Sequence, residues 1–152
     1  MCGRFSIFAD PERLAERFAA ALPAEPLAPR YNAAPSQTLP VLLNEGERVI
    51  QLLRWGLVPF WAKDPSVGDR MINARAESIE ERPAFRQAFE RFRCLVIADG
   101  FYEWQPRGHG PKQPWWITRE DHEPFAFAGL WSIWRPAPDV DYFSYPDLKL
   151  SG

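Results

Sequence analysis

The chain has 152 residues, of which 46% are hydrophobic and 25% charged, and this composition predicts one globular domain with a single buried core. Its formal net charge is −2, so there is no global basic field, and any nucleic-acid site has to be a local cluster. The two cysteines are too few for a disulfide scaffold, and we find neither a signal peptide nor an apolar run long enough to span a bilayer. We therefore expect a cytoplasmic protein without membrane contact.

The first third of the chain predicts a strand, a helix and a hairpin. Residues 4–8 alternate as a strand does, and Asp10 followed by Pro11 is typical of a helix start. After a proline-rich loop, residues 39–43 and 49–53 predict two strands, joined by the turn Asn44-Glu45-Gly46-Glu47.

Residues 54–61 combine aromatic side chains with Gly and Pro, which predicts a loop rather than a regular element. One interpretation is a rigid loop that packs on the core. The other is an aromatic surface for base stacking, with Trp55 as a stacking residue and Arg54 as a phosphate ligand. Composition alone favours the packing interpretation.

The second half of the chain predicts one helix and several strands. The aromatic spacing predicts a helix over 83–92 whose stripe packs on the core. Strands are expected around Val96, where Cys94 is an inert core residue, and after the Asp99-Gly100 turn. Two more strands are expected at 115–118 and 125–131, and residues 135–152 are expected to form an irregular tail.

Cys2 is the first candidate for chemistry. If Met1 is removed, Cys2 carries a free α-amine and a thiol on adjacent carbons, with ordinary pKa values of roughly 8 and 8.5. Such a 1,2-aminothiol condenses with an aldehyde through the amine, and the thiol then closes a five-membered thiazolidine ring. No internal cysteine can do this.

Three polar residues in apolar settings accompany Cys2, namely Asn32, Asn73 and Glu103. Glu103 lies between two aromatic residues on a predicted strand, and partial desolvation there would raise its pKa toward usefulness in acid–base chemistry. An outward-facing carboxylate is the alternative. His109 and His122 have no paired-ligand spacing, so we expect neither a metal nor a cofactor.

Five segments of the chain form an ordered set: Met1-Cys2-Gly3-Arg4-Phe5, Tyr31-Asn32-Ala33-Ala34-Pro35, Arg54-Trp55-Gly56-Leu57-Val58-Pro59 with Trp61, Ile72-Asn73-Ala74-Arg75-Ala76-Glu77 and Gly100-Phe101-Tyr102-Glu103-Trp104. In their order and rough spacing they resemble the SOS response-associated peptidase (SRAP) family, the abasic-site processing proteins. The resemblance implies an α+β fold, with a mainly antiparallel, β-barrel-like core and a few flanking helices. It assigns residues 1–134 to the SRAP-like domain.

The resemblance also implies a function: covalent crosslinking to abasic sites in single-stranded DNA through Cys2, with strand cleavage as a lyase at the Schiff-base stage. In this scheme Asn73 bonds the opened sugar or the nucleophile, and Glu103 shuttles protons. Arg4 and Arg75 hold flanking phosphates, and Asn32 lines the pocket near Cys2. The loop from Trp55 to Trp61 wedges against or stacks on bases beside the lesion.

The sequence departs from the family pattern near its end. The family continues with further strands and a His-Asp-Arg-Met-Pro segment, which is absent from this sequence, so we expect a truncated or divergent member. Two other functions therefore stay open: an N-terminal-nucleophile thiol peptidase, and a non-catalytic single-stranded-DNA-binding remnant. The expected partner is single-stranded DNA with abasic sites, bound by a monomer that needs no protein partner and joins the nucleoid when on DNA.

Overall fold

The computed structural model describes residues 3–149, with the backbone alone for residues 147–149. The helices are α1 (Pro11–Phe18) and α2 (Pro83–Arg91), with 3-10 turns η1 (Pro65–Arg70) and η2 (Ala76–Ser78). The strands are β1 (Phe5–Ile7), β2 (Arg30–Ala33), β3 (Thr38–Leu43), β4 (Ile50–Trp55), β5 (Asn73–Arg75), β6 (Arg93–Ala98), β7 (Gly100–Gln105), β8 (Gln113–Thr118), β9 (Phe125–Leu130), β10 (Ser132–Ala137), β11 (Val140–Tyr145) and β12 (Asp147–Lys149). Within residues 3–149 no helix is long and apolar enough to cross a bilayer.

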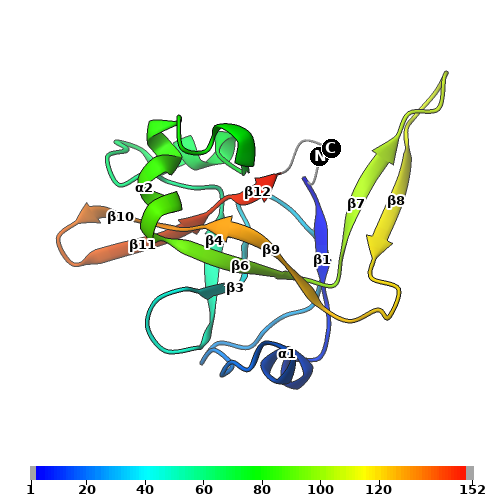
Figure 1. Ribbon diagram of the computed structural model, residues 1–152, viewed down its shortest axis with the longest axis horizontal. Helices are drawn as coiled ribbons and strands as arrows, with labels where there is room; N and C mark the ends of the chain where they lie inside the picture. Colours follow the sequence, from blue (N-terminus) through cyan, green and yellow to red (C-terminus); the bar gives the residue numbers. More distant parts are fainter. Residues whose placement is uncertain (1–2, 150–152) are drawn as a thin grey trace.

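The strands form two sheets (Figure 1). One is a four-stranded antiparallel sheet in the order β2-β1-β7-β8, and the other is an eight-stranded sheet in the order β10-β11-β4-β3-β6-β9-β12-β5. The predicted α+β class, with a mainly antiparallel core and few helices, is confirmed. The described strands do not close into one barrel, because the chain leaves the large sheet after β6 and enters the small one as β7.

Both predicted helices begin at a proline, as the sequence indicates. At the start of α1, the Asp10 side chain accepts the N–H of Glu12 at 2.9 Å, and this hydrogen bonding lowers the pKa of Asp10. The helix buries Leu14 against the core. Helix α2 buries Phe85 and Ala88, so its aromatic stripe faces the core as predicted.

The main core lies where the two sheets meet. The Phe5 and Trp55 rings lie 5.0 Å apart and join β1 of the small sheet to β4 of the large one. Cys94 is buried in the same cluster, as predicted, and its thiol donates to the Leu130 carbonyl at 3.3 Å. A second apolar cluster lies under α2 and includes Leu57. The first part of the loop after β4 is therefore buried.

The expectation of an irregular tail after residue 134 is wrong. Strands β10 and β11 form an antiparallel hairpin, β11 pairs in parallel with β4, and β12 pairs in parallel with β5. The alternation is hard to recognise because Pro136 interrupts β10, a position that only an edge strand tolerates. Tyr145 is fully buried, so this segment belongs to the domain core.

Candidate functional site

The segment that follows Cys2 is held by three strands of the small sheet. Met1 and Cys2 themselves lie outside the described residues. The Arg4 guanidinium donates to the Asn32 side-chain oxygen at 3.2 Å, and the Arg4 carbonyl accepts the Tyr102 N–H at 3.0 Å. The start of β1 is thereby fixed between β2 and β7, and two predicted DNA-binding residues, Arg4 and Asn32, lie side by side.

Glu103 lies on β7, one residue after the contact with Arg4. Its side chain is half-buried, so it keeps access to solvent. In the antiparallel ladder Glu103 is directly opposite Trp115 of β8, and paired residues project from the same face of a sheet. The structure therefore places the carboxylate next to the strand that Cys2 precedes, in aromatic surroundings.

Asn73 is joined to β1 through a buried tryptophan. The Trp55 indole N–H donates to the Ile72 carbonyl at 2.9 Å, directly before Asn73 at the start of β5. Because Trp55 also packs on Phe5, the first residues of β5 and β1 share one core residue. The segments that carry Asn73 and Glu103 thus both converge on the start of β1.

The same contacts correct the expectation for Trp55. Its side chain is fully buried, so it has no face on which a base could stack. The packing interpretation of this part of the loop is the right one. The rings that the loop exposes are Phe60 and Trp61, 62% and 54% accessible, and these were included in the predicted stacking loop.

Arg54 has a local partner rather than an open face. Its guanidinium forms an ion pair with Asp69 of η1, and its side chain is only 17% exposed. Its Nη1 atom is buried without a hydrogen-bond partner among the described residues. The structure therefore favours a structural role for Arg54 over the predicted phosphate contact. Arg75, at the end of β5, is exposed and accessible to a ligand.

Sequence reasoning missed the role of Asp99, which it treated only as a turn residue. The buried carboxylate accepts the N–H groups of Phe8 and Ala9, the latter at 3.0 Å, and so fixes the far end of β1. Burial raises its pKa, and the two N–H groups oppose that rise. The sequence did offer one signal for this role, because Asp99 directly precedes Gly100, the first residue of β7.

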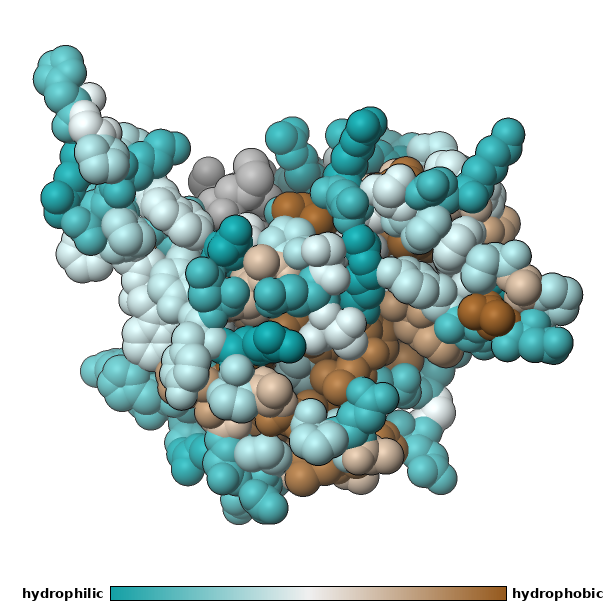
Figure 2. All heavy atoms as spheres, turned by 180° about the vertical axis from the view of Figure 1, so that it is seen from behind, coloured by the Kyte–Doolittle hydropathy of each residue, from teal (hydrophilic) through white to brown (hydrophobic). Residues whose placement is uncertain are grey.

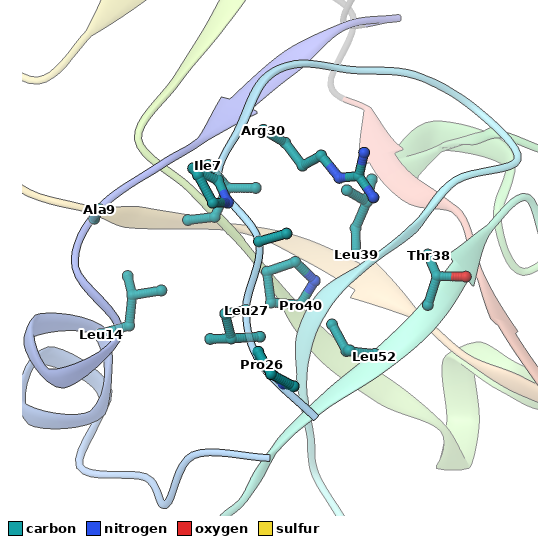
Figure 3. Close-up of a pocket in the computed structure, with 12 residues that line it drawn as sticks. Ile7, Ala9, Leu14, Pro26, Leu27, Arg30, Thr38, Leu39, Pro40 and Leu52 are labelled. Carbon is teal, nitrogen blue, oxygen red and sulfur yellow. The ribbon is translucent and has the colours of Figure 1, made fainter. Parts of the chain in front are cut away.

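A small pocket of about 70 Å³ lies elsewhere, between α1 and strand β3 (Figure 3). Leu14, Leu27, Pro40 and Leu52 are among the residues that line it, as Figure 3 shows, beside the polar residues Arg30 and Thr38. It holds none of the predicted site residues. We interpret it as a packing gap beneath the proline-rich segment, with no chemical role.

The two sheets and the flanking helices define an α+β protein. Its candidate site lies at the start of the first strand, β1. The family model for the SOS response associated peptidase (SRAP) matches residues 1–145. The chain belongs to this family. The match runs past residue 134, in agreement with the ordered hairpin β10–β11, and corrects the predicted domain boundary.

Named relatives support the assignment. The chain is 43% identical over 138 residues to the abasic site processing protein YoqW of Bacillus subtilis, covering 89% of this chain and 62% of YoqW. It is 32% identical over 138 residues to the abasic site processing protein HMCES of Xenopus tropicalis, covering 71% of this chain and 41% of HMCES. The chain thus spans less than two thirds of the length of these relatives.

Solved structures share the fold. A protein of Bacteroides thetaiotaomicron superposes with a TM-score of 0.86 at 24% identity, covering 99% of this chain and 68% of the other. A protein of Bordetella bronchiseptica superposes with a TM-score of 0.83 at 28% identity, covering 99% of this chain and 73% of the other. The large sheet and the small sheet are therefore a known arrangement.

Proposed function

We propose that this protein forms a covalent crosslink to abasic sites in single-stranded DNA through Cys2. The observation that carries the proposal is the hydrogen bond between Arg4 and Asn32 at the start of β1, together with the position of the strands that carry Glu103 and Asn73. Strand β7 pairs with β1, and the residue before Asn73 is joined to the core of β1 through Trp55. Only Gly3 and Arg4 separate Cys2 from β1 in the sequence, and the proposal requires that the amine and thiol of Cys2 reach these groups once Met1 has been removed.

The chemistry follows from the two groups of Cys2. The opened abasic sugar presents an aldehyde, and the α-amine adds to its carbon to give a carbinolamine, which loses water to form an imine. The thiol sulfur then adds to the imine carbon while its proton passes to the nitrogen, and the thiazolidine ring closes. One water molecule leaves in the whole sequence, and no oxidant or metal is consumed.

Side chains beside β1 supply proton transfer and binding in this scheme. Glu103 moves protons during loss of water and ring closure, which suits a half-buried carboxylate that keeps solvent access. Asn73 holds the opened sugar by hydrogen bonds. Arg4 and Arg75 hold phosphates on either side, since the guanidinium fork suits oxyanions.

The loop after β4 supplies the stacking surface. Leu57 and Val58 anchor it in the core, while Phe60 and Trp61 expose their rings. This arrangement gives two accessible aromatic rings on a fixed backbone, as a wedge beside an unpaired nucleotide requires. In this scheme Trp55 supports the loop from below.

Comparison of the parent with Cys2→Ser tests the proposal. Each protein is mixed with a single-stranded oligonucleotide that contains one abasic site and is resolved on a denaturing gel. We expect a heat-stable adduct with the parent alone, because serine lacks the thiol that closes the ring. A parent protein that binds the oligonucleotide without an adduct would support the non-catalytic alternative, and one that cleaves an unrelated peptide only with Cys2 intact would support the peptidase.

A further inference from the structure

The β7–β8 hairpin projects from the body of the molecule as a two-stranded ribbon (Figure 1). Figure 2 shows the same arm from behind, extending beyond the rest of the surface. Strand β8 is the edge of the small sheet and pairs with β7 alone among the described strands. Residues 104–117 are exposed, apart from half-buried Gln113. Because core packing does not account for such a long, exposed ribbon, we asked what it could bind.

The charge of the ribbon is opposite to that of the whole chain. Residues 104–118 contain Arg107, His109 and Lys112 and no Asp or Glu, although the chain carries a net charge of −2. Neither Arg107 nor Lys112 forms an ion pair within the part of the chain that the structure describes. Both cations at the tip are therefore available to an anionic partner.

Trp115 is an exposed ring held in a fixed position. Its indole N–H donates to the Gln105 side-chain oxygen at 2.9 Å, and the residue is 55% accessible. It lies directly opposite Glu103, on the same face of the sheet. A flat aromatic surface is thus presented next to the carboxylate of the proposed site.

The neighbouring Trp116 contacts β1 and the residue that follows it. It projects from the opposite face, where its indole N–H donates to Ser6 Oγ at 2.8 Å. Its ring also lies 6.1 Å from that of Phe8. Trp116 therefore anchors the ribbon on β1, while Trp115 lies on the face of the sheet that carries Glu103.

We propose that the β7–β8 ribbon holds the single strand on one side of the abasic nucleotide. Trp115 stacks on a neighbouring base, and Arg107 and Lys112 hold the phosphates beyond it. Arg107 lies four positions after Glu103, a span of at most about 14 Å, so the tip serves the DNA next to the lesion. This inference rests on the proposed function.

The chemistry of the ribbon favours single-stranded DNA over a protein partner. Stacking on an aromatic ring tolerates any base, and cations without acidic neighbours suit the phosphate backbone. The arm is also continuous with the proposed site, because Glu103 and Trp115 are paired across the same ladder. An acidic protein partner is the alternative that the experiment separates.

The test measures dissociation constants of the full chain for a fluorescent single-stranded oligonucleotide without an abasic site, at several salt concentrations. We expect Trp115→Ala to weaken binding about tenfold, and Trp115→Phe to stay within about threefold of the parent, because the phenyl ring still stacks. The double variant Arg107→Gln/Lys112→Gln should lower the slope of log K against log salt by about 1.4. The control Arg82→Gln/Arg91→Gln makes the same charge change at the two ends of α2 and should bind as the parent does.

Three results would overturn the ribbon's role: unchanged affinity of Trp115→Ala, equal losses in Trp115→Ala and Trp115→Phe, or a salt slope that the tip variant leaves unchanged. Urea unfolding of each variant establishes that it is folded. A parent protein that binds the oligonucleotide but forms no adduct with abasic DNA would contradict the proposed function, while the ribbon would still be judged by these constants. A parent protein that binds no single-stranded DNA would overturn both.

Discussion

Gly56 and Gly68 face each other so closely that neither has room for a side chain. A Cβ on Gly68 would lie 2.6 Å from the Gly56 carbonyl oxygen, and a Cβ on Gly56 would clash with the Gly68 carbonyl group. Gly56 also has a φ of +124°, which L-residues rarely adopt. This contact closes the loop that presents Phe60 and Trp61 and leads the chain back toward Asn73.

Substitution of either glycine by alanine should destabilise the fold. We expect Gly68→Ala to lower the free energy of unfolding by about 1–3 kcal/mol through overpacking, and Gly56→Ala to cost more because backbone strain is added. Gly46→Ala is the control, since Gly46 has a φ of +75° but open space around it, so only the strain remains. Urea unfolding measures all three, and an unchanged midpoint for Gly68→Ala would contradict the close contact.

The hairpin β10–β11 should stabilise the same loop. The Ser144 hydroxyl accepts the buried Val58 N–H at 2.7 Å, and the Tyr145 carbonyl accepts the Gly56 N–H at 2.6 Å. Ser144→Ala leaves the Val58 N–H without its acceptor, which should cost about 1–3 kcal/mol of unfolding free energy. Hydrogen exchange at Val58 should then be faster, and equal stability and exchange in variant and parent would argue against this role.

Local signals in the sequence were enough to predict the helices and most of the strands. Asp10 and Pro11 predict α1 because capping and a fixed φ act within one turn. The hairpin β3–β4 could be predicted because its two strands are adjacent in the chain. The parallel pairing of β11 with β4 could not, because it depends on residues about ninety positions apart.

The site was predicted residue by residue, but its geometry was not. The sequence resemblance selects Arg4 and Asn32, which a hydrogen bond joins, and Glu103, whose strand pairs with β1. Burial is what sequence reasoning missed: nothing in the motif says that Trp55 points into the core while Trp61 points out. Side chains in an irregular loop follow no period, so their directions require the structure.

Asp99 should make stability depend on pH. Burial raises its pKa above the ordinary 3.8, so the folded state binds the proton more tightly than the unfolded chain does. This contribution to stability is present below pH 3.8 and is lost as the pH rises through the folded pKa. Asp99→Asn should remove this slope, and at neutral pH it should be at least as stable as the parent, because its amide oxygen still accepts an N–H.

Urea unfolding between pH 4 and pH 8 checks the sign. Asp99→Ala serves as the comparison and should lose about 1–3 kcal/mol at every pH, because Phe8 and Ala9 lose their acceptor. If Asp99→Asn were less stable than the parent at neutral pH and equal to it in acid, the carboxylate would have a lowered pKa instead.

Glu103→Gln should slow crosslinking without weakening DNA binding. The amide keeps the shape of the side chain but cannot take up a proton, so we expect the rate at saturating DNA to fall by about 10²- to 10⁴-fold. Glu45→Gln, in the β3–β4 turn, makes the same charge change at an exposed position and should react as the parent does. Equal rates for Glu103→Gln and the parent would remove Glu103 from the mechanism.

Intact-protein mass spectrometry tests the central claim most directly. The protein is measured before and after incubation with a single-stranded oligonucleotide that carries one abasic site, beside Cys2→Ala as the control. The account predicts a starting mass without Met1, followed by an adduct equal to protein plus DNA minus one water. The corresponding adduct (protein plus DNA minus one water) in equal yield from Cys2→Ala, or no adduct from parent protein with a free Cys2 terminus, would contradict it.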